Sequence, residues 1–230
     1  MDKKKTKINT PQTVTSYING EWVEPKKSTH QFPIIHPANE AEVSTLYEAD
    51  AKEVKTAAKV AKKTFESGLW SKASVDDRKA VLLAIRDLIL ENQEEIAELE
   101  VMNTGVPIAQ VCGRQIPRSA MNFEFFAEFI SQASSPVFDQ NPDYITYVRR
   151  EPVGVAGLIA PWNAPMALAT MKVAGAIAFG NSCLLKPSEL TPLGFIPFMN
   201  LLSKAGLPDG VVNMVNGRGG VTGAAMTQEE

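Results

Sequence analysis

The sequence predicts an α/β protein whose second half is a parallel sheet flanked by helices. Three short apolar segments there alternate with two longer helical segments. The strands are expected at 153–159, 182–185 and 211–215, and the helices at 165–178 and 192–204. This alternation is typical of a β-α-β-α-β unit that is buried on both faces. Because such sheets bind ligands beyond the carboxyl ends of their strands, functional residues are expected there.

The composition is that of a globular protein with a buried core. Of the 230 residues, 44% are hydrophobic and 21% are charged, which excludes disorder of the whole chain. The formal net charge of -3 gives no basic surface for nucleic acid. Lysines cluster only near the N-terminus, within residues 1–15, which we interpret as a flexible, solvated tail.

Cysteine, histidine and hydropathy patterns narrow the class of protein further. The two cysteines, Cys112 and Cys183, lie far apart in the sequence, and no signal-peptide pattern is expected at the N-terminus. No disulfide framework is therefore indicated, and the cytoplasm is the expected location. His30 and His36 have no partners at metal-ligand spacing, so no metal site is expected. The longest apolar stretch, 153–178, is interrupted by glycines, prolines and a lysine, and no membrane span is expected.

The first half of the chain is predicted to be mainly helical. An Asn-Gly pair within 17–23 is typical of a tight β-hairpin, because both turn positions need positive φ. Asp50 begins a capping pattern for an amphipathic helix that ends at Gly68. Ser74 repeats the pattern for a second helix, which is expected to continue to near Gly105.

A third helix and an extended strand complete this half. The helix is expected to begin near Pro107 and to break near Gly113 or Pro117 before it resumes to Ile130. After a polar break, residues 144–150 are rich in β-branched and aromatic residues, which favours an extended strand. We expect that strand to form an arm rather than part of the core.

Polar residues follow the first two predicted strands of the parallel sheet. Asn163 could donate its amide to an oxyanion that forms in a cleft, or it could cap the next helix. Lys172, inside that helix, could face a water-filled cleft or carry its ammonium to the surface. Lys186 and Glu189 could hold the hydroxyls of a ribose, or form a surface ion pair near a helix start.

Glycines follow the third predicted strand, at Gly217, Gly219, Gly220 and Gly223. They would let the backbone approach a nucleotide closely. Their spacing is not the dinucleotide fingerprint, because Thr222 stands where its third glycine would be, and the phosphate-binding GxxxxGK pattern is absent from the sequence.

Taken together, three segments resemble the aldehyde dehydrogenase superfamily at its own spacing. They are Pro161-Trp162-Asn163-Ala164-Pro165, Met171-Lys172-Val173 and residues 180–193. The resemblance extends to residues 18–22, 150–155 and 206–213, and so covers nearly the whole chain after the tail.

The resemblance implies a Rossmann-like NAD-binding domain of which only the first part is present. Residues 16–136 would be its N-terminal helical part, 137–152 an oligomerisation arm that pairs with a neighbouring subunit, and 153–230 the first βαβαβ part, without the catalytic domain. The full-length enzyme is expected to be a homodimer or homotetramer. The incomplete sheet would expose an apolar edge, so we expect poor solubility of this chain alone.

The resemblance also implies roles for single residues. Asn163 resembles the family's oxyanion-hole amide, and Lys172 resembles the lysine that helps to order that site. The expected cofactor-binding residues are Ala160, Pro161 and Trp162 beside the cofactor, Lys186 and Glu189 at the adenosine ribose, Gly219 and Gly223 near the adenine and pyrophosphate, and also Ser188.

Cofactor and substrate expectations follow from these assignments. The Glu189 carboxylate would accept hydrogen bonds from ribose hydroxyls and repel a 2′-phosphate, so NAD is favoured over NADP. The substrate would be a small-molecule aldehyde. The helix after Asn163, through Met166 and Thr170, is expected to contribute to the aldehyde tunnel.

The chemistry of the resembled family needs a nucleophile that this segment does not supply. There, a thiolate attacks the aldehyde, hydride passes to the nicotinamide, and water activated by a glutamate releases the acid. Cys183 is expected in an apolar strand, where burial raises the thiol pKa, and Cys112 in a helix with no evident base, so both are expected to be structural. The sequence thus predicts the cofactor-binding part of an NAD-dependent aldehyde dehydrogenase, inactive alone.

Two alternatives remain open at the level of sequence. One is a truncated, catalytically inactive protein that binds nucleotide or pairs with a full-length subunit through its arm. The other is an unrelated α/β binding domain.

Overall fold

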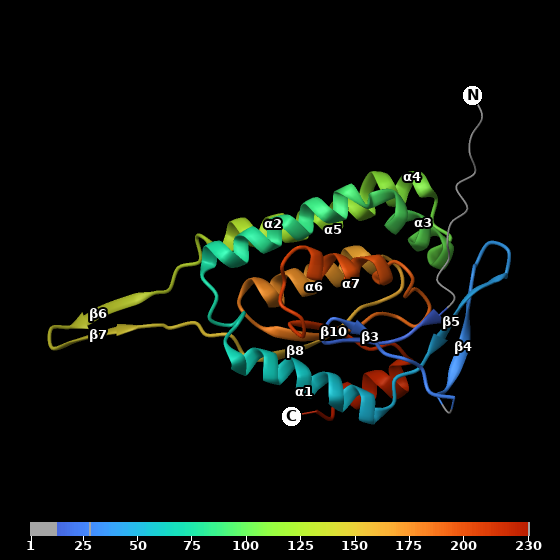
Figure 1. Cartoon of the computed structure of the whole chain (residues 1–230). Helices are drawn as coiled ribbons and strands as arrows, with labels where there is room; N and C mark the ends of the chain where they lie inside the picture. The colour runs from blue at the N-terminus through green and yellow to red at the C-terminus, as the bar shows by residue number, and fades with distance from the viewer. Residues whose placement is uncertain (1–12, 28, 230) are drawn as a thin grey trace.

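The computed structural model, which describes residues 13–27 and 29–229, has a mixed five-stranded sheet between layers of helices (Figure 1). The strands lie in the order β3-β2-β10-β9-β8. Strands β8 (Val155–Ile159), β9 (Ser182–Lys186) and β10 (Val212–Met214) are parallel, as the sequence predicts. The predicted hairpin forms β2 (Tyr17–Ile18) and β3 (Glu21–Trp22), and β2 joins β10 in antiparallel register.

Helices cover both faces of this sheet. Helices α6 (Pro165–Ala178) and α7 (Phe195–Lys204) cover one face, and α1 (Ala51–Ser67) covers the other (Figure 1). The prediction placed the start of α7 at Pro192. The helix begins at Phe195 instead, because the preceding residues form a turn in which Phe195 N donates to Pro192 O at 3.2 Å.

Capping residues set the ends of α1 as predicted. The Asp50 side chain accepts from Glu53 N at 2.8 Å, which satisfies one of the free N–H groups of the first turn. Gly68 closes the helix with φ of 81°, a conformation that favours glycine.

The second predicted helix is two helices. Ser74 caps α2 (Val75–Glu91), and α3 (Gln93–Thr104) follows it. They are separated at Asn92, whose φ of -103° and ψ of 20° leave the helical region and whose amide donates to Leu88 O at 2.8 Å. The prediction of one continuous helix to Gly105 is therefore wrong at Asn92, where the side chain satisfies the end of the first helix.

The third helical segment continues without a break. Helix α4 (Ile108–Gln110) continues through a π-helical turn (Val111–Gln115) into α5 (Ile116–Ile130). Pro117 cannot donate a backbone hydrogen bond, and a widened turn is a common way to accommodate that loss. Helices α2 and α5 form an outer layer over α6 (Figure 1), and their buried apolar side chains are part of the main core.

A second, three-stranded sheet was not predicted. It comprises β1 (Thr13–Val14), β5 (Glu42–Tyr47) and β4 (Gln31–Ile35), in that order. Val14 is fully buried against Ile34 and Leu46. Residues 13–15 are therefore part of the fold, and the predicted tail is too long at that end; its residues 1–12 lie outside the described residues.

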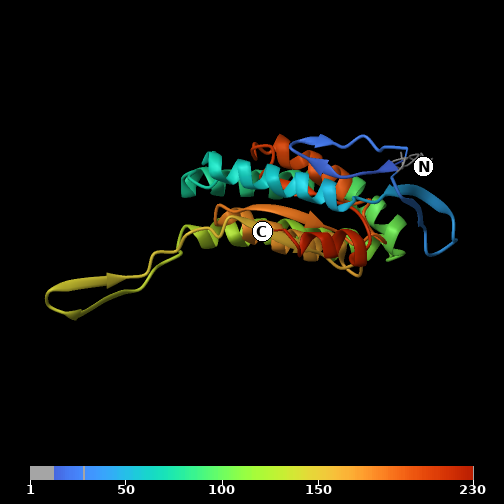
Figure 2. The same cartoon turned by 90° about the horizontal axis from the view of Figure 1, so that it is seen from below.

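The predicted arm is a β-hairpin, whereas the sequence indicated one strand. Strand β6 (Val137–Asn141) pairs with β7 (Tyr144–Tyr147) in antiparallel register. The polar run Asp139-Gln140-Asn141 obscured β6 in the sequence. The hairpin projects from one end of the molecule, opposite the β4–β5 end, in both views (Figures 1 and 2).

Candidate functional site

The carboxyl ends of the three parallel strands meet at one edge of the sheet. Ile159 of β8 lies opposite Lys186 of β9, and Leu185 lies opposite Met214 of β10. Ala160 N donates to Lys186 O at 2.9 Å, which carries the pairing one residue past β8. The three turns that the sequence singled out are therefore neighbours.

Lys186 is buried at this edge. It is 2% exposed, and its Nζ donates to Gly217 O at 2.7 Å and Pro187 O at 2.9 Å, with Glu189 Oε2 at 3.5 Å. Burial lowers the pKa of Lys186, and the negative charge of Glu189 opposes that change. A surface ion pair is thus the wrong description for Lys186.

Ser188 and Glu189 complete the turn after β9. The buried Ser188 hydroxyl accepts from Leu190 N at 3.3 Å and so shapes the turn itself. The Glu189 side chain is 28% exposed, so its carboxylate faces both Lys186 and solvent. This turn combines a fixed cation with an accessible carboxylate.

The glycine-rich segment after β10 packs onto Lys186. A Cβ at Gly223 would lie 3.5 Å from Lys186 Cε, in ordinary contact. Gly219 is exposed, and among the described atoms none lies within 4 Å of a Cβ there. Gly217 has φ of 152°, and a Cβ would lie 1.9 Å from Thr222 Oγ1. The segment therefore has two open glycines, Gly219 and Gly220, and one position, Gly217, where only glycine fits.

Sequence reasoning missed Glu48, which lies beside this segment. Its carboxylate accepts from Arg218 N and Nε at 2.9 Å each and from Nη2 at 2.7 Å. The hydrogen bond from the Arg218 side chain is the main reason that the pKa of Glu48 is lowered, and burial opposes it. The two residues are 170 positions apart, so no sequence spacing indicates their contact.

The turn after β8 is more open. Ala160 is buried, Pro161 and Asn163 are exposed, and the Trp162 side chain is 60% exposed. Helix α6 begins after Ala164, and the described residues give it no side-chain cap. The alternative that Asn163 caps this helix is therefore wrong.

Lys172 reaches back toward that turn. Its Nζ donates to Ile159 O, at the carboxyl end of β8. The lysine is only partly buried, so the ammonium is fixed at the sheet edge instead of extending freely into solvent. Lys172 and the residues after β8 thus lie at the same end of the sheet.

Two residues expected in the aldehyde tunnel are part of the core in this chain. Met166 and Thr170 are fully buried, and the Thr170 hydroxyl donates to Met166 O at 2.7 Å. Asn122 Nδ2 donates to Thr170 Oγ1 at 3.0 Å. The tunnel expectation is wrong here because neighbouring helices cover this face of α6.

Cys183 does not have the environment of a nucleophile. Cys183 is fully buried in β9, and burial raises its pKa to about 12, so the thiolate is strongly disfavoured. Cys112 lies half-buried in the π-helical turn. Both cysteines are free thiols.

A buried carboxyl, Glu100, supports the helices behind the site. A Cβ at Gly194 would lie 2.8 Å from Glu100 Oε1, so α7 begins in close contact with it. The nearby Met166 N–H lowers the pKa of Glu100 but falls short of hydrogen-bond geometry, and within the described part of the chain neither oxygen has a partner. Burial dominates and raises the pKa of Glu100 to about 8.

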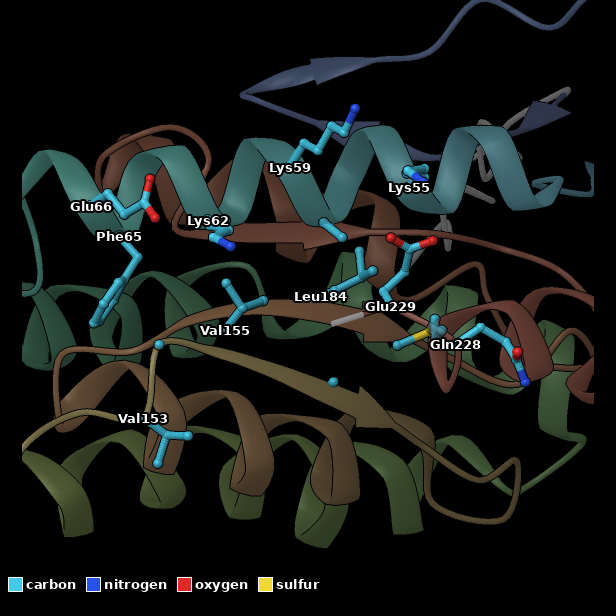
Figure 3. A pocket seen from close by; sticks show the side chains of 14 residues that line it. Lys55, Lys59, Lys62, Phe65, Glu66, Val153, Val155, Leu184, Gln228 and Glu229 are labelled. Carbon is cyan, nitrogen blue, oxygen red and sulfur yellow. The ribbon is translucent and has the colours of Figure 1, made fainter.

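Two concavities of the described residues lie away from these strand ends. One cavity of about 690 Å³ opens between α1 and β8, and Figure 3 shows Val155, Leu184 and Glu229 along it. Another, of about 980 Å³, lies beside Arg150 and Asn181, at the amino ends of the strands. The candidate site is therefore an open edge, identified by its chemistry instead of its depth.

The part of the chain that the structure describes has neither a metal-binding cluster nor a membrane-spanning helix. It contains no group of three or more His, Cys, Asp or Glu residues placed to bind a metal ion. In the same residues, no helix combines the length and the hydropathy that crossing a membrane requires.

Comparisons with known proteins agree on one family. The profile of the aldehyde dehydrogenase family matches residues 22–230. Aldehyde dehydrogenase 1 of Tanacetum cinerariifolium is 42% identical over 92% of this chain, and the NADP/NAD-dependent aldehyde dehydrogenase PuuC of Escherichia coli is 37% identical over 92%. The chain spans 42% and 43% of their respective lengths.

Solved structures give the same result. The NAD+ complex of an aldehyde dehydrogenase from Bacillus cereus superposes with a TM-score of 0.92 at 33% identity. The similarity covers 100% of this chain and 46% of that one.

Proposed function

The chain belongs to the aldehyde dehydrogenase family, and from this premise we propose that it is the cofactor-binding part of an enzyme that oxidises an aldehyde to a carboxylic acid with NAD. The turn after β9 carries the proposal. It presents a buried ammonium, Lys186, and a partly exposed carboxylate, Glu189, at the carboxyl edge of a parallel sheet. Ligands of such sheets bind at this edge.

The groups at this turn fit a ribose. Two strong hydrogen bonds to carbonyls fix the Lys186 ammonium, while its third contact, to Glu189 Oε2, is long at 3.5 Å. A hydroxyl could therefore accept from Lys186 and donate to Glu189. The open surface at Gly219 would let the rest of a nucleotide approach the backbone.

The residues after β8 would serve the chemical step. Bound NAD would supply the acceptor for hydride. Asn163, exposed and not engaged as a helix cap, would donate its amide to the carbonyl oxygen of the substrate as negative charge develops there. Lys172 would order the turn through Ile159 O, and Trp162 would lie beside the cofactor.

The charges at the edge favour NAD over NADP. Glu189 and Glu48 offset Lys186 and Arg218, so the site has no excess positive charge for a 2′-phosphate. Glu189 would repel that phosphate directly. The balance is close, and the related PuuC is named as an NADP/NAD-dependent enzyme, so we expect a preference and not exclusion.

Calorimetric titration of the purified chain with NAD and with NADP tests this proposal. We expect the wild-type chain to bind NAD more tightly than NADP. We expect Glu189→Gln to reduce this difference in affinity. Glu42→Gln, an exposed carboxylate on β5, is the matched control. Binding of NAD that Lys186→Met and Glu189→Gln both leave unchanged would place the nucleotide elsewhere and refute the assignment.

The 230 residues are proposed to be inactive alone. Cys183 is fully buried with a pKa of about 12, which disfavours its thiolate, and Cys112 lies half-buried in the π-helical turn. Aldehyde-dependent formation of NADH by the purified chain would contradict this. Loss of that activity in Cys112→Ser would identify the nucleophile instead.

Subunit pairing is a second candidate function, and the hairpin β6–β7 favours it. Both strands are exposed except at Asn141, and their large hydrophobic side chains are exposed to solvent: Val137, Phe138, Tyr144, Ile145, Tyr147. Exposed apolar surface of this kind is typical of an interaction site. A homodimer or homotetramer, in the cytoplasm, is the assembly we propose.

Sedimentation of the chain and of Ile145→Asp would test pairing. We expect an oligomer that Ile145→Asp weakens, because a charge would be buried at the contact. Asp143→Asn, between the two strands, is the control. A monomer at high concentration would refute self-pairing through the arm.

A further inference from the structure

The pair formed by Glu48 and Arg218 has no part in the nucleotide contacts proposed above. Glu48 follows β5 of the second sheet, and its side chain is 4% exposed. It holds Arg218 by two side-chain bonds and one backbone bond, between 2.7 and 2.9 Å. A bidentate pair with an added backbone bond fixes both the guanidinium and the amide of Arg218.

The residue before Arg218 is held against the same carboxylate. A Cβ at Gly217 would lie 2.9 Å from Glu48 Cγ, so the backbone passes in close contact. On the other side, Thr222 Oγ1 donates to Ala49 O at 2.8 Å, and Ala49 N donates to the Asn216 carbonyl at 2.8 Å. Residues 216–218 are thus clamped to residues 48–49.

The clamped backbone in turn holds Lys186. The Gly217 carbonyl accepts the shortest hydrogen bond of the ammonium, at 2.7 Å. Glu48 also acts on Lys186 through its charge. Burial lowers the pKa of Lys186, and the negative charge of Glu48 opposes that change. Arg218 also interacts with Glu189, after its stronger interaction with Glu48.

We propose that Glu48 is a positioning residue for the nucleotide ribose site. Through Arg218 it fixes the Gly217 carbonyl, and that carbonyl fixes the ammonium of Lys186. The inference rests on the proposed function, because it assumes that Lys186 and Glu189 contact the ribose. It adds that a strand outside the parallel sheet determines the geometry of that contact.

Two variants break the clamp from opposite sides. Glu48→Gln keeps the shape of the side chain and removes its charge. Arg218→Met removes the guanidinium of a side chain that is 50% exposed. It leaves the buried negative charge of Glu48 to act on Lys186. Glu42→Gln on β5 is the control, since it lies on the same strand and is exposed.

Two measurements on the chain without cofactor test the clamp. Amide hydrogen exchange reports on the backbone hydrogen bonds of residues 216–220, and NMR titration of the Lys186 ε-methylene reports on the pKa of that lysine. We expect exchange in residues 216–220 to accelerate about tenfold in both variants, because the Arg218 amide loses its charged acceptor or its anchor. The pKa of Lys186 should fall in Glu48→Gln and should not fall in Arg218→Met. Unchanged exchange and an unchanged Lys186 pKa in folded Glu48→Gln would overturn the clamp.

Binding of NAD then separates this inference from the proposed function. If both hold, NAD binds about tenfold more weakly to Glu48→Gln and Arg218→Met, and equally well to Glu42→Gln. If the clamp is broken but NAD affinity is unchanged, Glu48 does not position the ribose site. If the wild-type chain does not bind NAD, the proposed function fails for this chain, while exchange and titration still decide the clamp.

Discussion

The turns that follow β8 and β9–β10 lie at the same edge of one sheet, yet they differ in how they are held. Lys186, Gly217 and Arg218 are fixed by hydrogen bonds to each other and to Glu48. Asn163 and Trp162, after β8, are exposed, and their helix has no side-chain cap among the described residues.

This difference bears on the function proposed for the edge. A site that binds a cofactor gains from groups that are already in place, because less freedom is lost on binding. The turn after β8 has its backbone anchored at Ala160 and by Lys172 at Ile159 O, while its Trp162 and Asn163 side chains are exposed. We interpret the first region as preorganised by its own contacts and the second as anchored through its backbone alone.

The most severe test of the fixed region is Gly217→Val. The side chain would overlap Thr222 Oγ1 and Glu48 Cγ at a backbone φ of 152°. We expect a loss of about 4 kcal/mol in the free energy of unfolding, and a melting temperature lower by on the order of 10 °C. Gly219→Val is the control, because a Cβ there meets none of the described atoms within 4 Å. Similar losses in both variants would mean that the segment is not fixed at Gly217.

Glu100 tests what supports both regions from behind, since it lies near the start of α6 and against the turn before α7. Its pKa is about 8 in the folded chain and near 4.5 when exposed. Between these values the folded protein keeps a proton that the unfolded chain loses. The contribution of Glu100 to the free energy of unfolding is therefore fully present below about pH 4.5. It falls as the pH rises toward 8, by at most about 1.4 kcal/mol per pH unit.

Urea unfolding of Glu100→Gln from pH 5 to pH 8 measures this contribution. We expect the variant to lack the decline, because its side chain stays neutral. Glu95→Gln, exposed on the same helix, should keep the wild-type slope. Parallel slopes for wild type and Glu100→Gln would show that Glu100 ionises normally in the fold.

Lys186→Met compares the two lysines of the edge. It removes the donor from the carbonyls of Gly217 and Pro187, and we expect a loss of about 1–2 kcal/mol in the free energy of unfolding. Lys172→Met, which removes one contact of a half-buried side chain, should cost less than about 0.5 kcal/mol. Equal losses of unfolding free energy in the two variants would contradict the distinction between a fixed and an open turn.

The sequence predicted the parallel unit and its strand ends well, because apolar periodicity and caps such as Asp50 are local signals. It could not predict Glu48 beside Arg218 or the burial of Lys186, which depend on contacts across the fold. The second sheet was missed for a related reason, since short strands such as β1 are stabilised by partners distant in sequence. The split at Asn92 arose from a side chain that competes with the helical backbone.

Asn163→Ala should have the smallest effect on stability and is the sharpest test of the open turn. The side chain is exposed and is not a cap, so we expect the free energy of unfolding to change by less than about 0.5 kcal/mol. If Asn163 donates to the developing oxyanion, the same change in a full-length enzyme that carries this half would lower kcat by about 100-fold or more. NAD affinity should be unaffected, because the ribose turn is held separately. A loss of stability comparable to that of Lys186→Met would instead assign Asn163 a structural role, and the two regions would then differ in exposure alone.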